Sequence, residues 1–253
     1  MAIHAPGFRA ADRIVERREA LPADLPSGHY VVVDVLNFST TVVELLASGA
    51  THVHVPDERG AQVAYKRANP AARIGGEDGP DDEPTGAYDF VNSPTDVQGL
   101  DVEGRPVSFT SLNGGRTVSA LRNADGPIDV YVGSTTNAAT VARHLRGRAE
   151  PVFIVGAGSS GAVAGEDLIG ATLIDRYLDD VPLGRVELDR LREGVRVAKQ
   201  RRYGDSDAIP PTDVRDYAMN FDSRTVLPKL VGDVLVDETR TEATDNAQRQ
   251  AAD

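Results

Sequence analysis

Short apolar runs alternate with amphipathic stretches along most of this 253-residue chain, and that alternation is typical of an α/β fold. The apolar runs predict strands at residues 30–35, 51–55, 107–110, 130–132 and 152–155. The other stretches predict helices at residues 41–48, 58–68, 116–121, 138–145, 162–178, 185–200 and 213–219. We therefore expect a layered α/β/α architecture with a mixed or parallel sheet.

The chain is long enough for one large α/β domain or for two lobes folded together. We predict a single domain over residues 1–236, with closely packed sub-lobes near 1–105 and 106–236. Residues 75–104 are rich in Gly, Pro and acidic side chains and lack periodicity, which predicts a long surface loop or insert. The polar tail at residues 237–253 lacks a hydrophobic face, and we expect it to be disordered.

Composition removes several classes of function. The absence of cysteine excludes disulfides, zinc-thiolate sites and thiol nucleophiles. A net charge of -12 argues against a nucleic-acid partner, because phosphate backbones are bound through clustered cations. No apolar stretch approaches the roughly 20 residues of a membrane span, and a secretory leader is not apparent, so we expect a cytoplasmic protein with no membrane partner. Acidic residues are abundant and lysines are few, which suggests adaptation to high salt.

Polar motifs follow the predicted strands directly, where open α/β sheets place their ligand sites. The first is DVLNFSTT, in which Asp34 could ligate a metal or act as a nucleophile. Ser39, Thr40 and Thr41 could donate to a phosphate at the start of a helix. An equally weighted alternative is that Ser39 or Thr40 only caps that helix.

Two further motifs supply oxygen ligands. In GGEDGP, Glu77 is a hard carboxylate ligand suited to Mg²⁺, although carboxylates beside glycine are often only solvated. In YDFVNSP, Asn92 and Ser93 place neutral polar groups at a turn fixed by Pro94.

The motif TSLNGGRT combines amides with a cation. Asn113 and Gly114 allow backbone amides to converge on an anion, and Arg116 could bind phosphate or carboxylate through two hydrogen bonds. The alternative is an Asn-Gly turn with a surface arginine. In GSTTNAA, Ser134 and Asn137 repeat the pattern of a strand end that leads into a helix through polar groups.

The motif GAGSSG, followed by the acidic pair Glu166 and Asp167, is the richest in functional groups. It matches the dinucleotide-binding pattern GxGxxG formally, but the acidic residue expected after a second strand about 20 residues later is missing. We favour a phosphate-binding turn around Gly158 and Ser159, with Glu166 or Asp167 reaching a metal.

Taken in order, these motifs resemble the 2-phosphosulfolactate phosphatase (ComB) family over residues 31–178. No single motif is specific, but their joint order and spacing are. The resemblance implies an α/β hydrolase that uses Mg²⁺ to remove phosphate from phosphosulfolactate, on a route to coenzyme M, or from phosphates of related 2-hydroxy acids. The acidic composition suggests a member of haloarchaeal type.

The resemblance turns the polar motifs into a predicted site. The predicted metal ligands are Asp34, Glu77, Glu166 and Asp167, and the predicted catalytic groups are Asp34, Asn113 and Arg116. The predicted substrate-binding residues are Asn37, Ser39, Thr40, Asn92, Ser93, Gly114, Ser134, Asn137, Gly158 and Ser159. The expected partner is a small anionic phosphate ester, and a homodimer is left open.

Two departures from the family pattern put the substrate in question. The family usually carries arginine where this chain has Asn37, and threonine where it has Gly115. An arginine at the first position would pair with an anionic group of the substrate. Three alternatives therefore stay open: a phosphatase for another small acid, a nucleotide-binding oxidoreductase using GAGSSG, and a non-catalytic relative that senses an acid phosphate.

Overall fold

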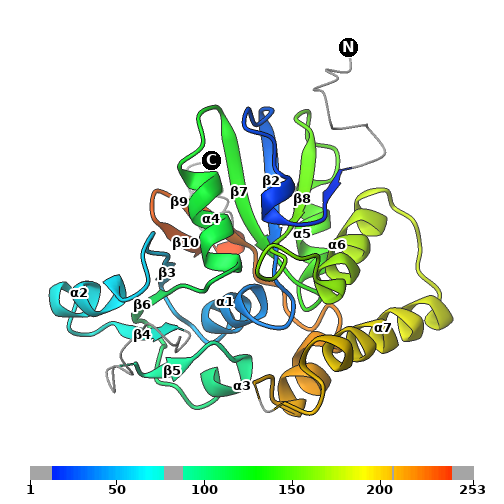
Figure 1. Ribbon diagram of the computed structural model, residues 1–253. Helices are drawn as coiled ribbons and strands as arrows, with labels where there is room; N and C mark the ends of the chain where they lie inside the picture. The colour runs from blue at the N-terminus through cyan, green and yellow to red at the C-terminus, as the bar shows by residue number, and fades with distance from the viewer. Residues whose placement is uncertain (1–12, 77–87, 207, 241–253) are drawn as a thin grey trace, which may run out of the picture.

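A computed structural model describes residues 13–76, 88–206 and 208–240, and its central feature is a ten-stranded mixed sheet (Figure 1). The sheet order is β1-β8-β2-β7-β9-β10-β3-β6-β4-β5. The strands are β1 Ile14–Val15, β2 Gly28–Val33, β3 His52–His54, β4 Arg73–Gly76, β5 Phe90–Val91, β6 Pro106–Phe109, β7 Ile128–Gly133, β8 Val152–Gly156, β9 Pro228–Val231 and β10 Val234–Asp237. The helices are η1 Arg18–Ala20, α1 Phe38–Ala47, α2 Ala61–Ala68, α3 Pro94–Val97, α4 Gly114–Arg122, α5 Ala138–Leu145, α6 Gly165–Leu178, α7 Arg185–Tyr203 and η2 Asp213–Ala218. The predicted α/β class and mixed sheet are confirmed.

The sheet consists of two parallel halves joined by an antiparallel hairpin. Strands β1, β8, β2 and β7 are parallel to one another, as are β3, β6, β4 and β5. The hairpin β9-β10 lies between the halves and pairs antiparallel with both β7 and β3. The two halves therefore run in opposite directions along the sheet.

Twist brings the carboxyl ends of the two halves to the same region. Five strand-to-strand steps separate β2 from β6 in the sheet order. At about 20–25° a step, they rotate one strand relative to the other by roughly 100–125°, which offsets much of the reversal. Loops that follow β2 and β6 consequently meet around α1, which lies in front of the sheet near its centre in Figure 1.

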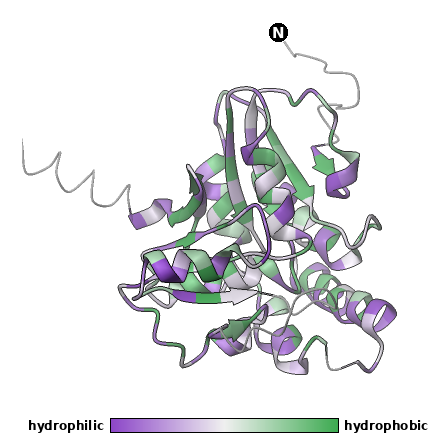
Figure 2. Cartoon of the chain, turned by 60° about the vertical axis from the view of Figure 1, so that its left-hand side comes forward, coloured by the Kyte–Doolittle hydropathy of each residue, from purple (hydrophilic) through white to green (hydrophobic). Residues whose placement is uncertain are grey.

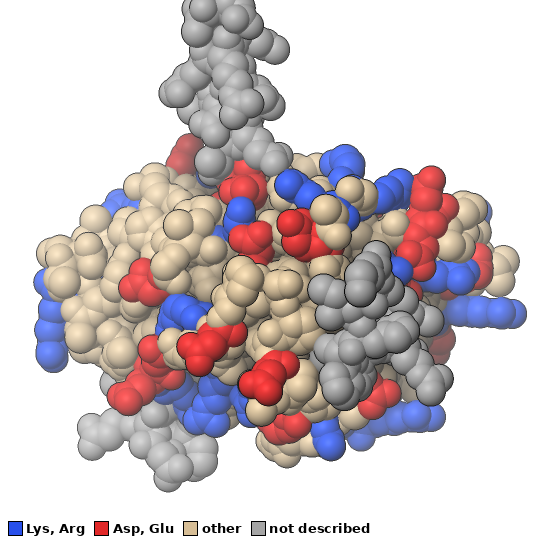
Figure 3. Space-filling model, turned by 90° about the horizontal axis from the view of Figure 1, so that it is seen from above, with Lys and Arg blue, Asp and Glu red and all other residues tan. Residues whose placement is uncertain are grey.

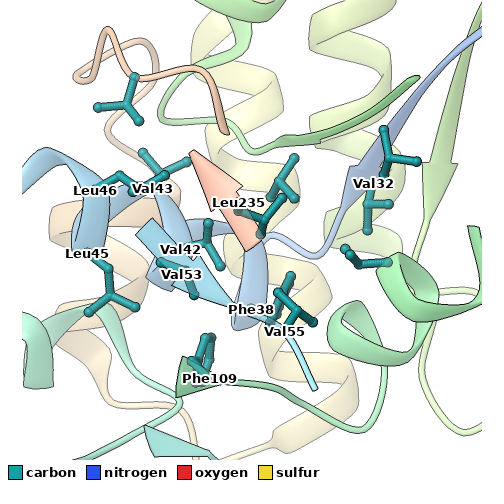
Figure 4. Packing of buried hydrophobic residues seen from close by; sticks show 14 of the residues in the cluster. Val32, Phe38, Val42, Val43, Leu45, Leu46, Val53, Val55, Phe109 and Leu235 are labelled. Carbon is teal, nitrogen blue, oxygen red and sulfur yellow. The ribbon is translucent and has the colours of Figure 1, made fainter. Parts of the chain in front are cut away.

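The core has two layers because the central strands are buried on both faces. On β2, Tyr30 and Val32 pack with α1 and α4, while Val31 and Val33 pack with α5 and α6 on the other face. Figure 4 shows the first layer, where side chains of α1 meet those of β3, β6 and β10. The helices in Figure 2 carry both hydrophilic and hydrophobic residues, as expected of helices with one side on the sheet and the other in solvent. Burial of both faces explains why the strands read as continuous apolar runs.

Several sequence-based expectations need correction. Residues 75–104 are not one long loop, because β5 and α3 form within them and the end of β4 overlaps their start. Asp237, expected in a disordered tail, ends β10 and is buried, with its Oδ1 accepting from the N–H of Leu227 and of Thr239. Strands β1, β4, β5, β9 and β10 were not predicted, and predicted helix 41–48 begins earlier, at Phe38.

The surface carries charges of both signs, which are interspersed over the face seen in Figure 3. Many are paired, as in the contact of Arg13 with both Asp175 and Asp179. Within the part of the chain that the structure describes, no helix has the length and apolar character needed to cross a bilayer. Adaptation to high salt stays a prediction.

Candidate active site

Asp34 lies at the carboxyl end of β2, where the buried strand turns into α1. The residue is 8% exposed, and Oδ2 accepts a hydrogen bond of 3.0 Å from the backbone N–H of Gly114. Its own backbone N–H donates to Oγ of Ser39 at 2.9 Å, which closes the turn before α1. Two motifs that lie 80 residues apart in the chain are thereby joined at one carboxylate.

Asp167, in the first turn of α6, links two further motifs. Its Oδ1 accepts from the N–H of Val35 at 2.9 Å, and its Oδ2 accepts from the N–H of Gly158 at 3.0 Å. The side chain is almost fully buried. Asp167 thus fastens the GAGSSG turn to the end of β2, next to Asp34.

Glu166 brings a third buried carboxylate to this region. Its Oε1 accepts from Nη1 of Arg202 at 2.9 Å, while its Oε2 is buried with no hydrogen-bond partner. Burial raises the pKa of Asp167 well above its ordinary value, and the charges of Asp34 and Glu166 raise it further. The three carboxylates therefore repel one another in a site with low access to water.

The sequence interpretation missed the cations that border this site. Arg202, near the end of α7, pairs with Glu166 and lies over the ring of Tyr203, with 4.8 Å between its Cζ and the ring centroid. Burial raises the pKa of Tyr203 to about 12. On the other side, Nη1 of Arg17 donates to the carbonyl of Gly161 at 2.6 Å. Their sequence context, an amphipathic helix and the chain before β2, carries no motif that would mark them.

The remaining predicted residues of the site differ in their placement. Oδ1 of Asn113 accepts from the N–H of Ser160 at 3.4 Å, so the loop after β6 also touches the GAGSSG turn. Arg116 lies exposed in the first turn of α4. Glu77 lies outside the described residues. A Cβ at Gly115 would stand 2.2 Å from Oγ1 of Thr110, so the larger side chain usual in the family does not fit this backbone.

Several predicted substrate-binding groups are used inside the protein. Oγ of Ser39 donates to the carbonyl of Val32, and Oγ1 of Thr40 contacts Oγ of Ser134 at 2.6 Å. Asn137 accepts from the N–H of Ser134 and donates to the carbonyl of Val226, all below the surface. These contacts stabilise the loops between strand and helix. The alternative in which Ser39 or Thr40 caps the helix is wrong, because α1 already begins at Phe38 and its N-cap residue, Asn37, makes no side-chain capping hydrogen bond.

The amides of the GAGSSG turn are likewise occupied. The N–H of Gly158 donates to Asp167, and the N–H of Ser159 donates to the carbonyl of Ala162. Helix α6 begins only at Gly165, whereas a dinucleotide fingerprint needs the turn to open the helix directly. The geometry therefore does not support the dinucleotide interpretation, and it leaves the Gly158 amide bound to a carboxylate.

Asn92 and Ser93 contact a different set of residues. Oγ1 of Thr41 donates to Oδ1 of Asn92 at 3.3 Å, and Oγ of Ser93 donates to Oδ1 of Asp213 at 2.9 Å. Asn37 lies at the start of α1, where its carbonyl accepts from Oγ1 of Thr41 and its Oδ1 is buried with no hydrogen-bond partner. The predicted residues thus divide between a carboxylate cluster and a neighbouring polar cluster on α1.

The donor set can be tested against the expected Mg²⁺. Among the described residues, no group of three or more His, Asp or Glu side chains is arranged to hold a metal ion. Mg²⁺ in phosphoryl-transfer sites commonly takes only one or two carboxylates, with water and substrate oxygens completing its shell. The unpartnered Oε2 of Glu166 and the repulsion among three carboxylates fit that smaller requirement.

Comparison with known proteins decides the family. The family model for 2-phosphosulpholactate phosphatase matches residues 15–208. The chain belongs to the 2-phosphosulpholactate phosphatase family. It is similar to probable 2-phosphosulfolactate phosphatases of Deinococcus radiodurans, with 36% identity over 72% of this chain and 75% of the relative, and of Symbiobacterium thermophilum, with 37% identity over 62% and 66%. A third relative of the same description, from Gloeobacter violaceus, is 35% identical over 56% of this chain and 59% of its own length.

Membership of the 2-phosphosulpholactate phosphatase family confirms the resemblance drawn from the motifs and classes the chain as a phosphoric monoester hydrolase. The matched range includes the whole carboxylate cluster, from Asp34 through Asp167 to Arg202. The match ends before η2, so Asp213, the η2 residue that accepts a hydrogen bond from Ser93, lies outside it. The individual roles predicted for the site residues stay predictions.

Proposed function

We propose that this protein hydrolyses the phosphate monoester of a 2-hydroxy acid, converting 2-phospho-3-sulfolactate and water to 3-sulfolactate and phosphate, with Mg²⁺ as cofactor. The observation that carries the proposal is the meeting of Asp34, Glu166 and Asp167 where loops after β2, β6 and β8 converge. The family match supports the reaction class, and the names of the relatives support the substrate.

Each carboxylate has a separate role in this proposal. Asp34, fixed by the Gly114 amide, either attacks phosphorus or orients the attacking water. Asp167 is held by two backbone amides, so it serves chiefly to position the GAGSSG turn and to add negative charge. Oε2 of Glu166, together with Asp34, would hold Mg²⁺. The ion would neutralise phosphoryl charge and so reduce the repulsion that slows attack on a dianion.

The neighbouring cations complete the charge balance. Phosphoryl transfer concentrates negative charge on the equatorial oxygens, and enzymes stabilise it with preorganised cations or N–H donors. The amides of Gly114 and Gly158 already donate to carboxylates, so they are poor candidates for that task. Arg116, exposed at the start of α4, and Arg202, at the rim of the cluster, are the better candidates.

Phosphate release tests the proposal directly. Purified protein is assayed at high salt with phosphosulfolactate, phospholactate and p-nitrophenyl phosphate, each with Mg²⁺ and with EDTA. We expect release that depends on Mg²⁺ and is fastest with phosphosulfolactate. Asp34→Asn, which keeps the size of the side chain, should lose at least about 100-fold in turnover while the protein stays folded. Absence of release from folded wild-type protein with all three esters would refute the proposed reaction.

A trapping experiment separates the two roles open to Asp34. If Asp34 is the nucleophile, protein quenched in acid during turnover carries the phosphoryl group as an acyl phosphate that hydroxylamine cleaves. If water attacks directly, quenched protein carries no covalent phosphate.

A further inference from the structure

A second polar cluster, separate from the carboxylates of the active site, lies where α1, η2 and the loop after β7 meet. Nε and Nη2 of Arg224 both donate to one carboxylate oxygen of Glu44 on α1, Oε2, at 3.1 and 2.8 Å. The backbone N–H of Arg224 donates to the carbonyl of Thr136, which places the loop after β7 beside this ion pair. Asp213 and Tyr217 enter from η2.

Four oxygen atoms of this cluster are buried without a hydrogen-bond partner. They are Oε1 of Glu44, Oδ2 of Asp213, the hydroxyl of Tyr217 and Oγ1 of Thr136, on residues that are 5, 2, 3 and 0% exposed. Buried polar atoms in proteins almost always have a partner, so several orphans in one place indicate a missing bound species. Burial first, and then the charges of Glu44 and Asp213, raise the pKa of the Tyr217 phenol, while Arg224 lowers it, so both carboxylates lie near enough to act on the phenol.

The charge of the cluster indicates which species is missing. Burial raises the pKa of both Glu44 and Asp213, although the Arg224 guanidinium on Glu44 and the hydrogen bonds from Ser93 and Thr95 to Asp213 oppose that rise. Ionisation of both carboxylates therefore needs more positive charge than the cluster itself holds. Arg224 supplies one positive charge against these two negative charges. With both carboxylates ionised, the cluster has a net charge of one negative unit, which a single monovalent cation neutralises and a divalent ion exceeds.

We propose that Glu44, Thr136, Asp213 and Tyr217 form a buried site for a monovalent cation, Na⁺ or K⁺, that ties η2 to α1. Carboxylate, phenol and hydroxyl oxygens are hard ligands of the kind that alkali cations bind. A cation that binds only the folded state stabilises that state by mass action, so the bound ion would hold η2 against α1.

Thermal unfolding in different chlorides tests the site without any substrate. Wild-type protein is melted in KCl, NaCl or choline chloride at equal ionic strength, because choline is too large for the site while screening is the same. We expect K⁺ or Na⁺ to raise Tm by about 5 °C over choline at saturating concentration. Asp213→Asn keeps an acceptor for Ser93 but removes the charge, and it should abolish most of that difference. The matched control Asp216→Asn, on an exposed side chain of the same helix, should retain it.

A second variant keeps the test decisive if Asp213→Asn does not fold. Tyr217→Phe removes one ligand oxygen and no charge, and it should raise several-fold the cation concentration that gives half of the Tm effect. Equal Tm values for the wild type in KCl, NaCl and choline chloride would overturn the proposal in favour of a trapped proton or water. A rise specific to MgCl₂ that Asp213→Asn removes would overturn the choice of a monovalent ion. Because the readout is Tm, neither outcome depends on phosphatase activity.

Discussion

The backbone N–H of Gly114 donates to Oδ2 of Asp34 across 3.0 Å, and the same glycine leaves no room for a side chain. A Cβ at this position would stand 2.7 Å from that oxygen and 2.6 Å from Cβ and Cδ1 of Phe38. Phe38 cannot retreat easily, because its ring stacks on Phe109 with 5.3 Å between centroids. The absence of a side chain at position 114 therefore lets α4 approach β2 and fix the Asp34 carboxylate.

Gly114→Ala should consequently impair turnover more than stability. Overpacking costs about 1–3 kcal/mol of unfolding free energy, whereas displacement of a reacting group by about 1 Å can reduce the rate about 100-fold. Urea denaturation and phosphate release measure the two effects. Gly184→Ala is the matched control, because a Cβ there would meet nothing closer than Oε2 of Glu187 at 3.7 Å. Wild-type turnover in Gly114→Ala would show that this placement of Asp34 is not required.

Removal of Arg202 should destabilise the fold through Glu166. The guanidinium is the partner of a carboxylate whose side chain is 3% exposed, and its loss leaves that charge buried and unpaired. We expect Arg202→Ala to lower the unfolding free energy by about 3 kcal/mol. Arg201→Ala, exposed and adjacent on α7, should change it by less than about 0.5 kcal/mol.

The double variant Arg202→Ala with Glu166→Gln makes this explanation specific. Once Glu166 is neutral, the loss of Arg202 should cost little, so urea denaturation of the four proteins should give a coupling energy of at least about 1 kcal/mol. Additive losses would mean that Arg202 acts through its packing on Tyr203 instead.

The carboxylate motifs were predictable from the sequence because their cause is local. The apolar run of β2 is followed directly by Asp34 and then by the hydroxyl residues of α1. This local order places the carboxylate at the end of a strand, and it does not depend on how the rest of the chain folds. Helix α5 was predicted with its observed bounds, Ala138–Leu145, since its apolar spacing is regular and polar loop residues precede it. In these cases the periodicity and the end signals agree.

The unpredicted parts depend on long-range pairing. Strand β1 is two residues long and exists through its pairing with β8, and the hairpin β9-β10 inserts between strands that precede it by many residues. The contact of Arg202 with Glu166 spans 36 residues and two helices. No local pattern distinguishes Arg202 from the exposed arginines on α7, so only the packing of α7 on α6 reveals it.

Mg²⁺ should stabilise the protein in the absence of substrate. Because Asp34, Glu166 and Asp167 repel one another, a cation bound at Oε2 of Glu166 relieves an unfavourable interaction in the folded state. We expect Mg²⁺ at about 100 times its dissociation constant to raise Tm by about 5 °C.

Glu166→Gln should reduce that rise, while Glu193→Gln on the exposed face of α7 should leave it unchanged. The rise should also persist in Asp213→Asn, since the second polar cluster does not contain the Mg²⁺ ligands. A wild-type Tm that is the same in MgCl₂ and EDTA would argue against a metal site at Glu166.

Asp167 should make metal-free protein less stable as pH rises. Burial first, and then the charges of Asp34 and Glu166, raise its pKa in the folded state above that of the unfolded chain. The folded state therefore binds more protons, and the unfavourable contribution of ionised Asp167 disappears as pH falls through the folded pKa. Asp167→Asn cannot ionise and removes this dependence, although it also exchanges one acceptor oxygen for an NH₂ group beside a backbone N–H.

The measurement compares Asp167→Asn with the wild type by urea denaturation in EDTA between acidic and neutral pH. The unfolding free energy of the variant minus that of the wild type should increase as pH rises. Asp125→Asn, on an exposed side chain, should give a much flatter difference. Added Mg²⁺ should reduce the slope for Asp167, because a cation beside the carboxylates lowers their pKa values. A difference that is independent of pH would mean that the two backbone amides fully offset burial and the neighbouring charges, and a reversed slope would mean that they outweigh them.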